Sequence, residues 1–195
     1  MKVVCGLGNP GAEYEDTRHN VGWWAVEAAA GAWAFPRFRR EGAARLSQGR
    51  IGEETVWLLE PLTYMNRSGS AVARLLGIEG FDIAQDLLVV VDDAALPLGR
   101  LRMRGEGSAG GHNGLRSIEA ALRRRDYPRL RIGVGGAPPG VDLADWVLSP
   151  FEPEEADVVR SRLPDVVAGM RTWIEEGLEP AIQRVNATRE GADST

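Results

Sequence analysis

The chain contains only two histidines, His19 and His112, and each is followed directly by an asparagine. Histidine is the side chain best suited to act as a base near neutral pH, and a neighbouring carboxylate can orient the ring and raise its basicity. Asp92 follows the apolar run DLLVVV, which we expect to form a buried strand. Because sites in α/β sheets assemble at the carboxyl ends of strands, Asp92 is a candidate partner for a histidine base.

Three asparagines lie at junctions between predicted loops and helices: Asn9 in GLGNPG, Asn66 in TYMNRSG and Asn113 in GGHNG. Taken alone, each is better explained as a turn former or a helix cap than as a functional residue. A side-chain amide also donates and accepts hydrogen bonds, which suits it to grip a peptide-like or nucleotide group. No G-x-S-x-G motif is present, and the single cysteine, Cys5, lies in a predicted core strand. These residues therefore indicate a hydrolase that activates water directly.

Residues 6–11, GLGNPG, match the G-x-G-x-x-G pattern of dinucleotide-binding loops, but the rest of that unit is missing. The stretch PGAEYED delays the following helix to about Thr17, and the acid expected about 20 residues onward would be Glu27, inside that helix. A second match, GEGSAG at 105–110, also lacks its context. We therefore expect no nucleotide cofactor. We expect no metal either, because two distant histidines and one cysteine do not have the spacing of a zinc site.

Charge is distributed unevenly along a chain whose net charge is −5. Residues 151–195 carry ten acids and five arginines, whereas residues 97–131 carry nine arginines and three acids, a local net charge of +6. A solvated protein face would explain this segment, and so would a contact with phosphate groups. The net negative charge therefore does not exclude a nucleic-acid substrate.

The elements that must position these residues alternate between strands and helices, which predicts an α/β fold. Residues 98–104 alternate between apolar or glycine positions and arginines, so we expect an exposed strand there and a mixed sheet. Pro164 predicts a break in the last helical region. The expected strands are 2–7, 43–51, 55–60, 86–91, 98–104 and 130–134, and the expected helices are 17–31, 66–76, 114–124 and 152–178.

The length of 195 residues predicts one domain, which we place at residues 1–185, a mixed β-sheet flanked by helices. Residues 186–195, NATREGADST, have the composition of a disordered tail. No apolar stretch approaches 18 residues, and the N-terminus reads as a strand instead of a signal peptide. We therefore expect a cytoplasmic protein with no membrane partner.

Several long motifs in this order resemble bacterial peptidyl-tRNA hydrolases. The resemblance runs from Val3 to about Phe151 and continues loosely through the C-terminal helices. It implies the fold of that family, a monomer without a cofactor, and hydrolysis of the ester between a peptide and the 3′ end of tRNA, which recycles tRNA dropped by ribosomes. The motifs are GLGNPGAEYEDTRHNVGW, PLTYMNRSG, DDAALPLGRLRMRGEGSAGGHNGLRSI, YPRLRIGVGG and WVLSPF.

The resemblance also implies roles for individual residues. His19 matches the base that activates water, Asp92 the carboxylate that keeps this imidazole basic, and Asn9 the residue that helps to distinguish N-blocked from free aminoacyl-tRNA. The remaining matches are contacts to the substrate. Asn66 and Asn113 match the amides that hold the peptide and the 3′ end, with Tyr14 and Tyr64 beside them, and Arg104 and Arg131 match the pair that clamps the tRNA 5′-phosphate.

Departures from the family pattern lie outside the candidate catalytic residues His19, Asp92 and Asn9. Ala95 stands where a carboxylate is usual, so a second acid that tunes the site is in doubt, and Tyr64 stands where phenylalanine is usual. His112 is equally compatible with packing or loop support and with substrate contact. A non-catalytic RNA-binding protein could keep the same pocket, but the intact set of candidate catalytic residues favours an enzyme.

Overall fold

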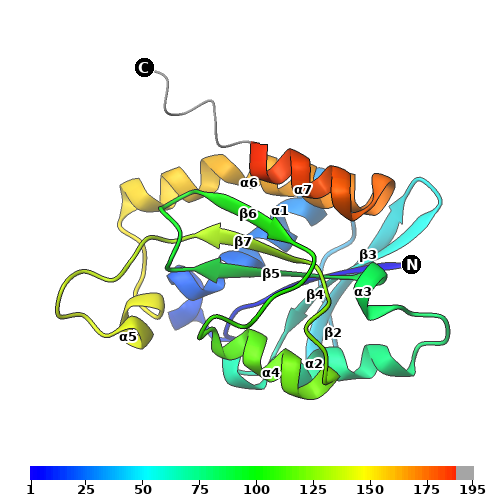
Figure 1. Cartoon of the computed structure of the whole chain (residues 1–195), viewed down its shortest axis with the longest axis horizontal. Coiled ribbons are helices and arrows are strands. Elements are labelled where there is room, and N and C mark those ends of the chain that lie inside the picture. The colour runs from blue at the N-terminus through cyan, green and yellow to red at the C-terminus, as the bar shows by residue number, and fades with distance from the viewer. Residues whose placement is uncertain (188–195) are drawn as a thin grey trace.

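The computed structural model describes residues 1–187 and contains a seven-stranded mixed sheet in that part of the chain (Figure 1). The strand order is β2-β3-β4-β1-β5-β7-β6, and the four inner strands β4, β1, β5 and β7 are parallel. Both edges are antiparallel, so the predicted mixed α/β sheet is confirmed. The strands are β1 (Lys2–Gly6), β2 (Arg39–Glu41), β3 (Ala44–Ile51), β4 (Glu54–Pro61), β5 (Leu87–Asp93), β6 (Leu101–Arg104) and β7 (Arg129–Gly133).

Helices cover both faces of the sheet and give it two apolar cores. One core packs the sheet against α1 (Val21–Ala32), α6 (Pro153–Glu176) and α7 (Leu178–Ala187). The other packs it against α2 (Gly69–Val72) and α4 (Asn113–Leu122). Two short helices, α3 (Ile83–Asp86) and α5 (Leu143–Val147), lie in the connections. In the described part of the chain, none of the helices combines the length and hydropathy needed to cross a bilayer.

Helix α1 lies directly on β1 because two glycines remove the side chains between them. A Cβ atom on Gly6 would lie 2.1 Å from the carbonyl oxygen of Gly22, and a Cβ on Gly22 would lie 2.5 Å from the Val90 carbonyl oxygen in β5. This close approach brings the turn before α1, residues 18–20, to the carboxyl end of β5. Two segments far apart in the sequence thereby meet at one edge of the sheet.

Two expectations about the helices were wrong. The segment predicted as one helix at 66–76 consists of the 3₁₀ turn Met65–Arg67, α2 and the 3₁₀ turn Ala73–Gly77. Pro164 does not break α6, because burial of the residues after it against the sheet offsets the roughly 3 kcal/mol cost of a proline in a helix. The helix ends instead at Gly177, whose φ of 95° is unfavourable for other residues.

The predicted disordered tail at 186–195 was placed too early. Helix α7 continues to Ala187, and the side chain of Asn186 exchanges two hydrogen bonds with the backbone of Met103 in β6, at 2.8 and 3.1 Å. The rest of that predicted tail, residues 188–195, lies outside the described residues.

Candidate active site

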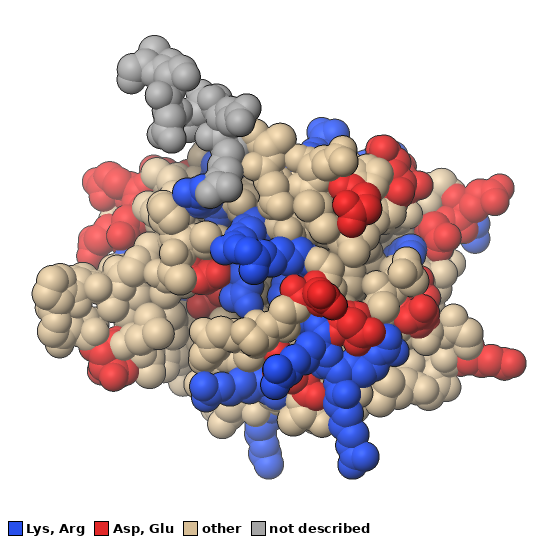
Figure 2. Space-filling model, in the orientation of Figure 1, with Lys and Arg blue, Asp and Glu red and all other residues tan. Residues whose placement is uncertain are grey.

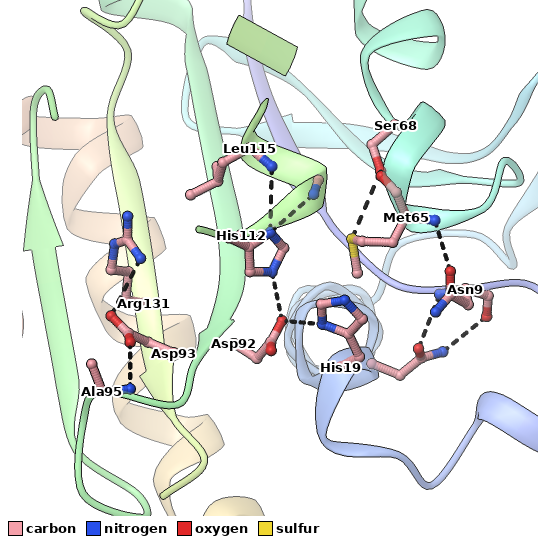
Figure 3. Close-up of polar contacts among 12 residues, drawn as sticks. Asn9, His19, Met65, Ser68, Asp92, Asp93, Ala95, His112, Leu115 and Arg131 are labelled. Carbon is pink, nitrogen blue, oxygen red and sulfur yellow. Dashed lines mark hydrogen bonds and ion pairs between the residues drawn. The ribbon is translucent and has the colours of Figure 1, made fainter. Parts of the chain in front are cut away.

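His19 and Asp92 meet at the carboxyl edge of the sheet (Figure 3). His19 lies in the 3₁₀ turn Arg18–Asn20 that precedes α1, and Asp92 lies near the end of β5. His19 Nδ1 is 2.8 Å from Asp92 Oδ1, and both residues are buried. Because a carboxylate only accepts hydrogen bonds, Nδ1 carries the proton of a neutral His19. The lone pair of the ring is then on Nε2, which is the form that a general base requires.

His112 contacts the same carboxylate oxygen, and its ring centre lies 4.9 Å from that of His19 (Figure 3). Its Nε2 is 2.7 Å from Asp92 Oδ1, and its Nδ1 accepts the backbone N–H groups of Gly114 and Leu115 at 3.1 and 3.3 Å. His112 is therefore the N-cap of α4, and its Nε2–H donates to Asp92. Of the roles left open by the sequence, the structure shows loop support and adds a bond to the carboxylate. The sequence already marked His112 as a candidate, because it is the only histidine besides His19.

The two imidazoles determine the charge of Asp92. Burial by itself raises the pKa of this carboxyl, but the charges and hydrogen bonds of His112 and His19 outweigh burial and hold the pKa well below its usual range. Asp92 therefore remains ionised wherever His19 can act as a base. An ionised Asp92 stabilises the imidazolium that forms when His19 takes a proton.

The same three side chains come close enough together to suggest a metal site, since their ligand atoms all lie within 4.8 Å of one another. A metal would need the lone pair of His112 Nε2. That nitrogen carries the proton, because Nδ1 faces two backbone donors. The geometry therefore fits a chain of hydrogen bonds between two imidazoles and a carboxylate better than it fits metal ligands.

Asn9 is buried beside this group and is held at both its side chain and its backbone. Its Oδ1 accepts the N–H of Met65 at 2.7 Å, so Nδ2 is the end of the amide that can donate to a substrate. The side chain of Asn20 accepts from the Asn9 N–H at 2.9 Å and donates to the Asn9 carbonyl at 3.0 Å. Sequence reasoning missed Asn20, although its position directly after His19 was a usable signal.

The other predicted substrate contacts surround this edge of the sheet. Asn113 is exposed at the start of α4 and, with His19 and Asp92, lines a cavity of about 490 Å³. Tyr14 and Tyr64 form an edge-to-face pair with ring centres 6.3 Å apart, and Tyr64 is 57% exposed. Asn66 is exposed in the turn that follows Tyr64. The structure thus brings Asn113 into the cavity of the histidines and pairs the two tyrosines with each other.

Arg104 and Arg131 lie on adjacent antiparallel strands, but they are not opposite each other. Arg131 in β7 pairs with Arg102 in β6, and Arg104 pairs with the buried Arg129. Arg104 is exposed, whereas Arg131 borders the cavity and forms an ion pair with Asp93 at 3.3 Å. Figure 2 shows basic side chains gathered where β6, β7 and α4 lie in Figure 1. This face is a surface suited to phosphate groups.

Ala95, where a carboxylate is usual in the family that the sequence resembles, lies on the wall of the same cavity. Its N–H donates to Asp93 Oδ1 at 2.8 Å, and Asp93 Oδ2 forms the ion pair with Arg131. The nearest carboxylate at this wall is therefore already engaged by a backbone group and an arginine.

Comparison with known proteins gives one consistent result. The family model for peptidyl-tRNA hydrolase matches residues 3–193. The peptidyl-tRNA hydrolase of Gemmatimonas aurantiaca is 46% identical over 185 residues, 93% of this chain and 97% of the relative, and that of Symbiobacterium thermophilum is 44% identical over 195 residues, 95% and 98%. The crystal structure of peptidyl-tRNA hydrolase from Acinetobacter baumannii superposes with a TM-score of 0.88 at 30% identity, covering 96% of this chain and 95% of that one.

Proposed function

The chain belongs to the peptidyl-tRNA hydrolase family and hydrolyses peptidyl-tRNA, and we propose that His19 is the base that activates the attacking water. The observation that carries this proposal is the 2.8 Å contact between His19 Nδ1 and Asp92 Oδ1, which leaves the lone pair on Nε2. Asp92 holds the ring in this tautomer and stabilises its protonated form. His112 supports Asp92 without touching the reacting atoms.

The reaction proceeds in two steps, in which His19 first takes up one proton and then returns it. Nε2 of His19 takes a proton from water as the water oxygen attacks the ester carbonyl carbon, which forms a tetrahedral oxyanion. The C–O bond to the tRNA ribose then breaks, and the imidazolium of His19 returns the proton to the leaving ribose oxygen. The products are free tRNA and a peptide carboxylic acid, which loses its proton to the solvent. A positioned base contributes roughly 10² to 10⁴ in rate, and each donor aimed at the oxyanion about 10² to 10³.

Amide side chains seat the acyl part of the substrate in this proposal. Asn9 Nδ2 donates to the acyl group and helps to distinguish N-blocked from free aminoacyl-tRNA, because its Oδ1 is engaged by Met65. Asn66 and Asn113, both exposed at the edges of the site, bind the peptide and the 3′ end. Tyr14 and Tyr64 form the aromatic wall next to them.

The basic surface over β6, β7 and α4, called the arginine face below, binds the acceptor end of tRNA in this proposal. Arg104 and Arg131 clamp the 5′-phosphate, and contact with phosphate alone lets one enzyme accept many tRNA sequences. The ion pair with Asp93 holds Arg131 in place at the border of the cavity. In keeping with the family resemblance, we also propose that the enzyme acts as a monomer, and we place it in the cytoplasm, where it recycles tRNA dropped by ribosomes.

The test is hydrolysis of N-acetyl-aminoacyl-tRNA beside unblocked aminoacyl-tRNA, by the wild type and His19→Ala. We expect rapid cleavage of the blocked substrate only, and a loss of at least about 10²-fold in kcat in the variant with tRNA binding retained. Binding of tRNA without cleavage by either protein would show a non-catalytic RNA-binding protein instead.

The affinity for tRNA, measured at several salt concentrations, tests the arginine face, the basic surface that contains Arg104 and Arg131. Arg104→Ala should lower the slope of log affinity against log salt by about one, whereas Arg171→Ala, an exposed arginine on α6, should leave it unchanged. Equal slopes for the two variants would remove Arg104 from the phosphate clamp.

A further inference from the structure

Arg18 directly precedes His19, yet its side chain reaches to the start of α6 and is buried, with 2% of it exposed. Its Nη1 donates to Ser149 Oγ at 2.8 Å and to the carbonyl oxygens of Ser149 and Pro150. Its Nη2 forms an ion pair with Glu155 at 2.5 Å. A buried guanidinium with this many partners holds the segment around residue 150 against the turn that carries His19.

The backbone reinforces this connection. The N–H of Arg18 donates to the Ser149 carbonyl at 3.1 Å, and the N–H of Phe151 donates to the Asp16 carbonyl at 3.1 Å. Thr17 and Pro150 form an antiparallel bridge between these two bonds. Residues 16–18 and 149–151 therefore pair like two very short strands.

Helix α5 depends on the same arginine. The Arg18 guanidinium lies 3.5 Å from the centre of the Trp146 ring, and Trp146 Nε1 donates to the Gly135 carbonyl at 2.9 Å. Of the five residues of α5, only Val147 is buried, and Leu143 is 55% exposed, so apolar packing holds this helix weakly. The other side of α5 lines the cavity of His19 and Asp92 through residues 142–144 and 147.

The contacts of Arg18 require an arginine. Its planar group stacks on a ring with its face while its edge donates to several acceptors at once, and a lysine ammonium cannot do both. The Glu155 carboxylate is itself fixed, because Oε2 also accepts the N–H of Glu152 in the capping box of α6. Arg18 thus joins α5, the start of α6 and the turn of the base.

We propose that Arg18 is a positioning residue that holds α5 as the wall of the catalytic cavity at a fixed place relative to His19, so that the substrate is seated against the base. The inference rests on the proposed role of His19. Because Asp92 holds the His19 ring independently of Arg18, loss of Arg18 changes how the substrate is bound and leaves the basicity of His19 unchanged.

The experiment compares Arg18→Lys with Arg160→Lys in the full chain, using N-acetyl-aminoacyl-tRNA over a range of pH. Arg160 is the matched control, since it also lies over a tryptophan ring, 4.9 Å from the centre of Trp24, but is half exposed. For Arg18→Lys we expect KM to rise roughly tenfold, kcat to stay within about threefold, and the pH midpoint of kcat to be unchanged. Arg160→Lys should match the wild type.

Trp146→Leu provides a second variant that keeps the buried ion pair and decides the question if Arg18→Lys does not fold. It should raise KM by a similar factor, and the double variant should raise KM no further, because both changes release the same wall. A KM within twofold of the wild type in a folded variant would overturn the proposal. So would a shifted pH midpoint, which would place the effect on the base. Failure of the proposed function can be told apart from failure of this proposal, because in that case His19→Ala keeps the kcat of the wild type.

Discussion

Two buried carboxylates near the carboxyl ends of β5 and β4, Asp92 and Glu60, differ in what surrounds them. Asp92 Oδ1 receives two imidazole nitrogens at 2.7 and 2.8 Å, and the side chains of His19 and His112 are only 9% and 8% exposed. The Glu60 side chain is 0% exposed, and its Oε2 lies 2.5 Å from Nη2 of Arg45. Arg45 is partly exposed and also contacts Glu27 at 3.5 Å, so its charge is shared.

The pKa values of the two groups move in opposite directions. Burial raises the pKa of both carboxyls. At Asp92 the two histidines outweigh burial, whereas at Glu60 burial outweighs Arg45 and raises the pKa to about 8. Asp92 is therefore charged at neutral pH, and Glu60 is largely protonated. The comparison teaches that the donors aimed at a buried carboxylate decide its charge, and that burial alone does not mark a catalytic acid.

The largest expected difference between the two is in catalysis. Asp92→Asn should lower kcat roughly 10² to 10⁴-fold, because the imidazolium of His19 loses its counter-charge, and Glu60→Gln should leave kcat within about twofold. Single-turnover hydrolysis of N-acetyl-aminoacyl-tRNA measures both. Comparable losses of kcat in the two variants would show that Asp92 and Glu60 do not differ in their importance for catalysis.

The next effect is on stability, and it belongs to Glu60. Between the ordinary pKa of 4.5 and the folded value of about 8, the folded protein keeps a proton that the unfolded chain has released. The free energy of unfolding contributed by this group therefore falls as pH rises through that window, by at most about 1.4 kcal/mol per pH unit. Urea unfolding of the wild type and Glu60→Gln at pH 5, 6.5 and 8 should show the variant gaining relative stability with pH. A constant difference would mean that Glu60 is already ionised.

The smallest expected effects concern His112, whose bond to Asp92 and whose cap of α4 can be tested separately. His112→Ala should cost about 1 kcal/mol of stability through the lost cap of α4, and roughly tenfold in kcat through the lost bond to Asp92. His112→Asn keeps a capping side chain without reaching Asp92, so it should recover the stability but not kcat. Recovery of both by asparagine would show that capping is the whole role of His112. Thermal unfolding and the hydrolysis assay together give this answer.

Part of the fold could be predicted because its signals are local. The apolar runs at 2–7 and 86–91 identify the central strands β1 and β5, and the strands expected at 43–51 and 55–60 match β3 and β4 to within one residue at each end. The alternation of residues 98–104 predicted an exposed strand, and the structure has the shorter strand β6 there, at one edge of the sheet with Leu101 and Met103 buried. Helix interruptions were predicted less well, because whether a proline such as Pro164 is tolerated depends on packing against the sheet and not on its neighbours in the chain.

The sequence by itself determined the family, the alternating α/β pattern and the identity of His19 and Asp92 as chemical candidates, since motifs and residue types are read directly from the chain. Only the tertiary structure decided that His112 shares one oxygen of Asp92 with His19, that Arg131 faces Arg102 and is held by Asp93, and that Arg18 anchors α5. These contacts join residues that are between 20 and about 130 positions apart. Periodicity and spacing report local conformation, whereas such contacts depend on how the elements pack around the sheet.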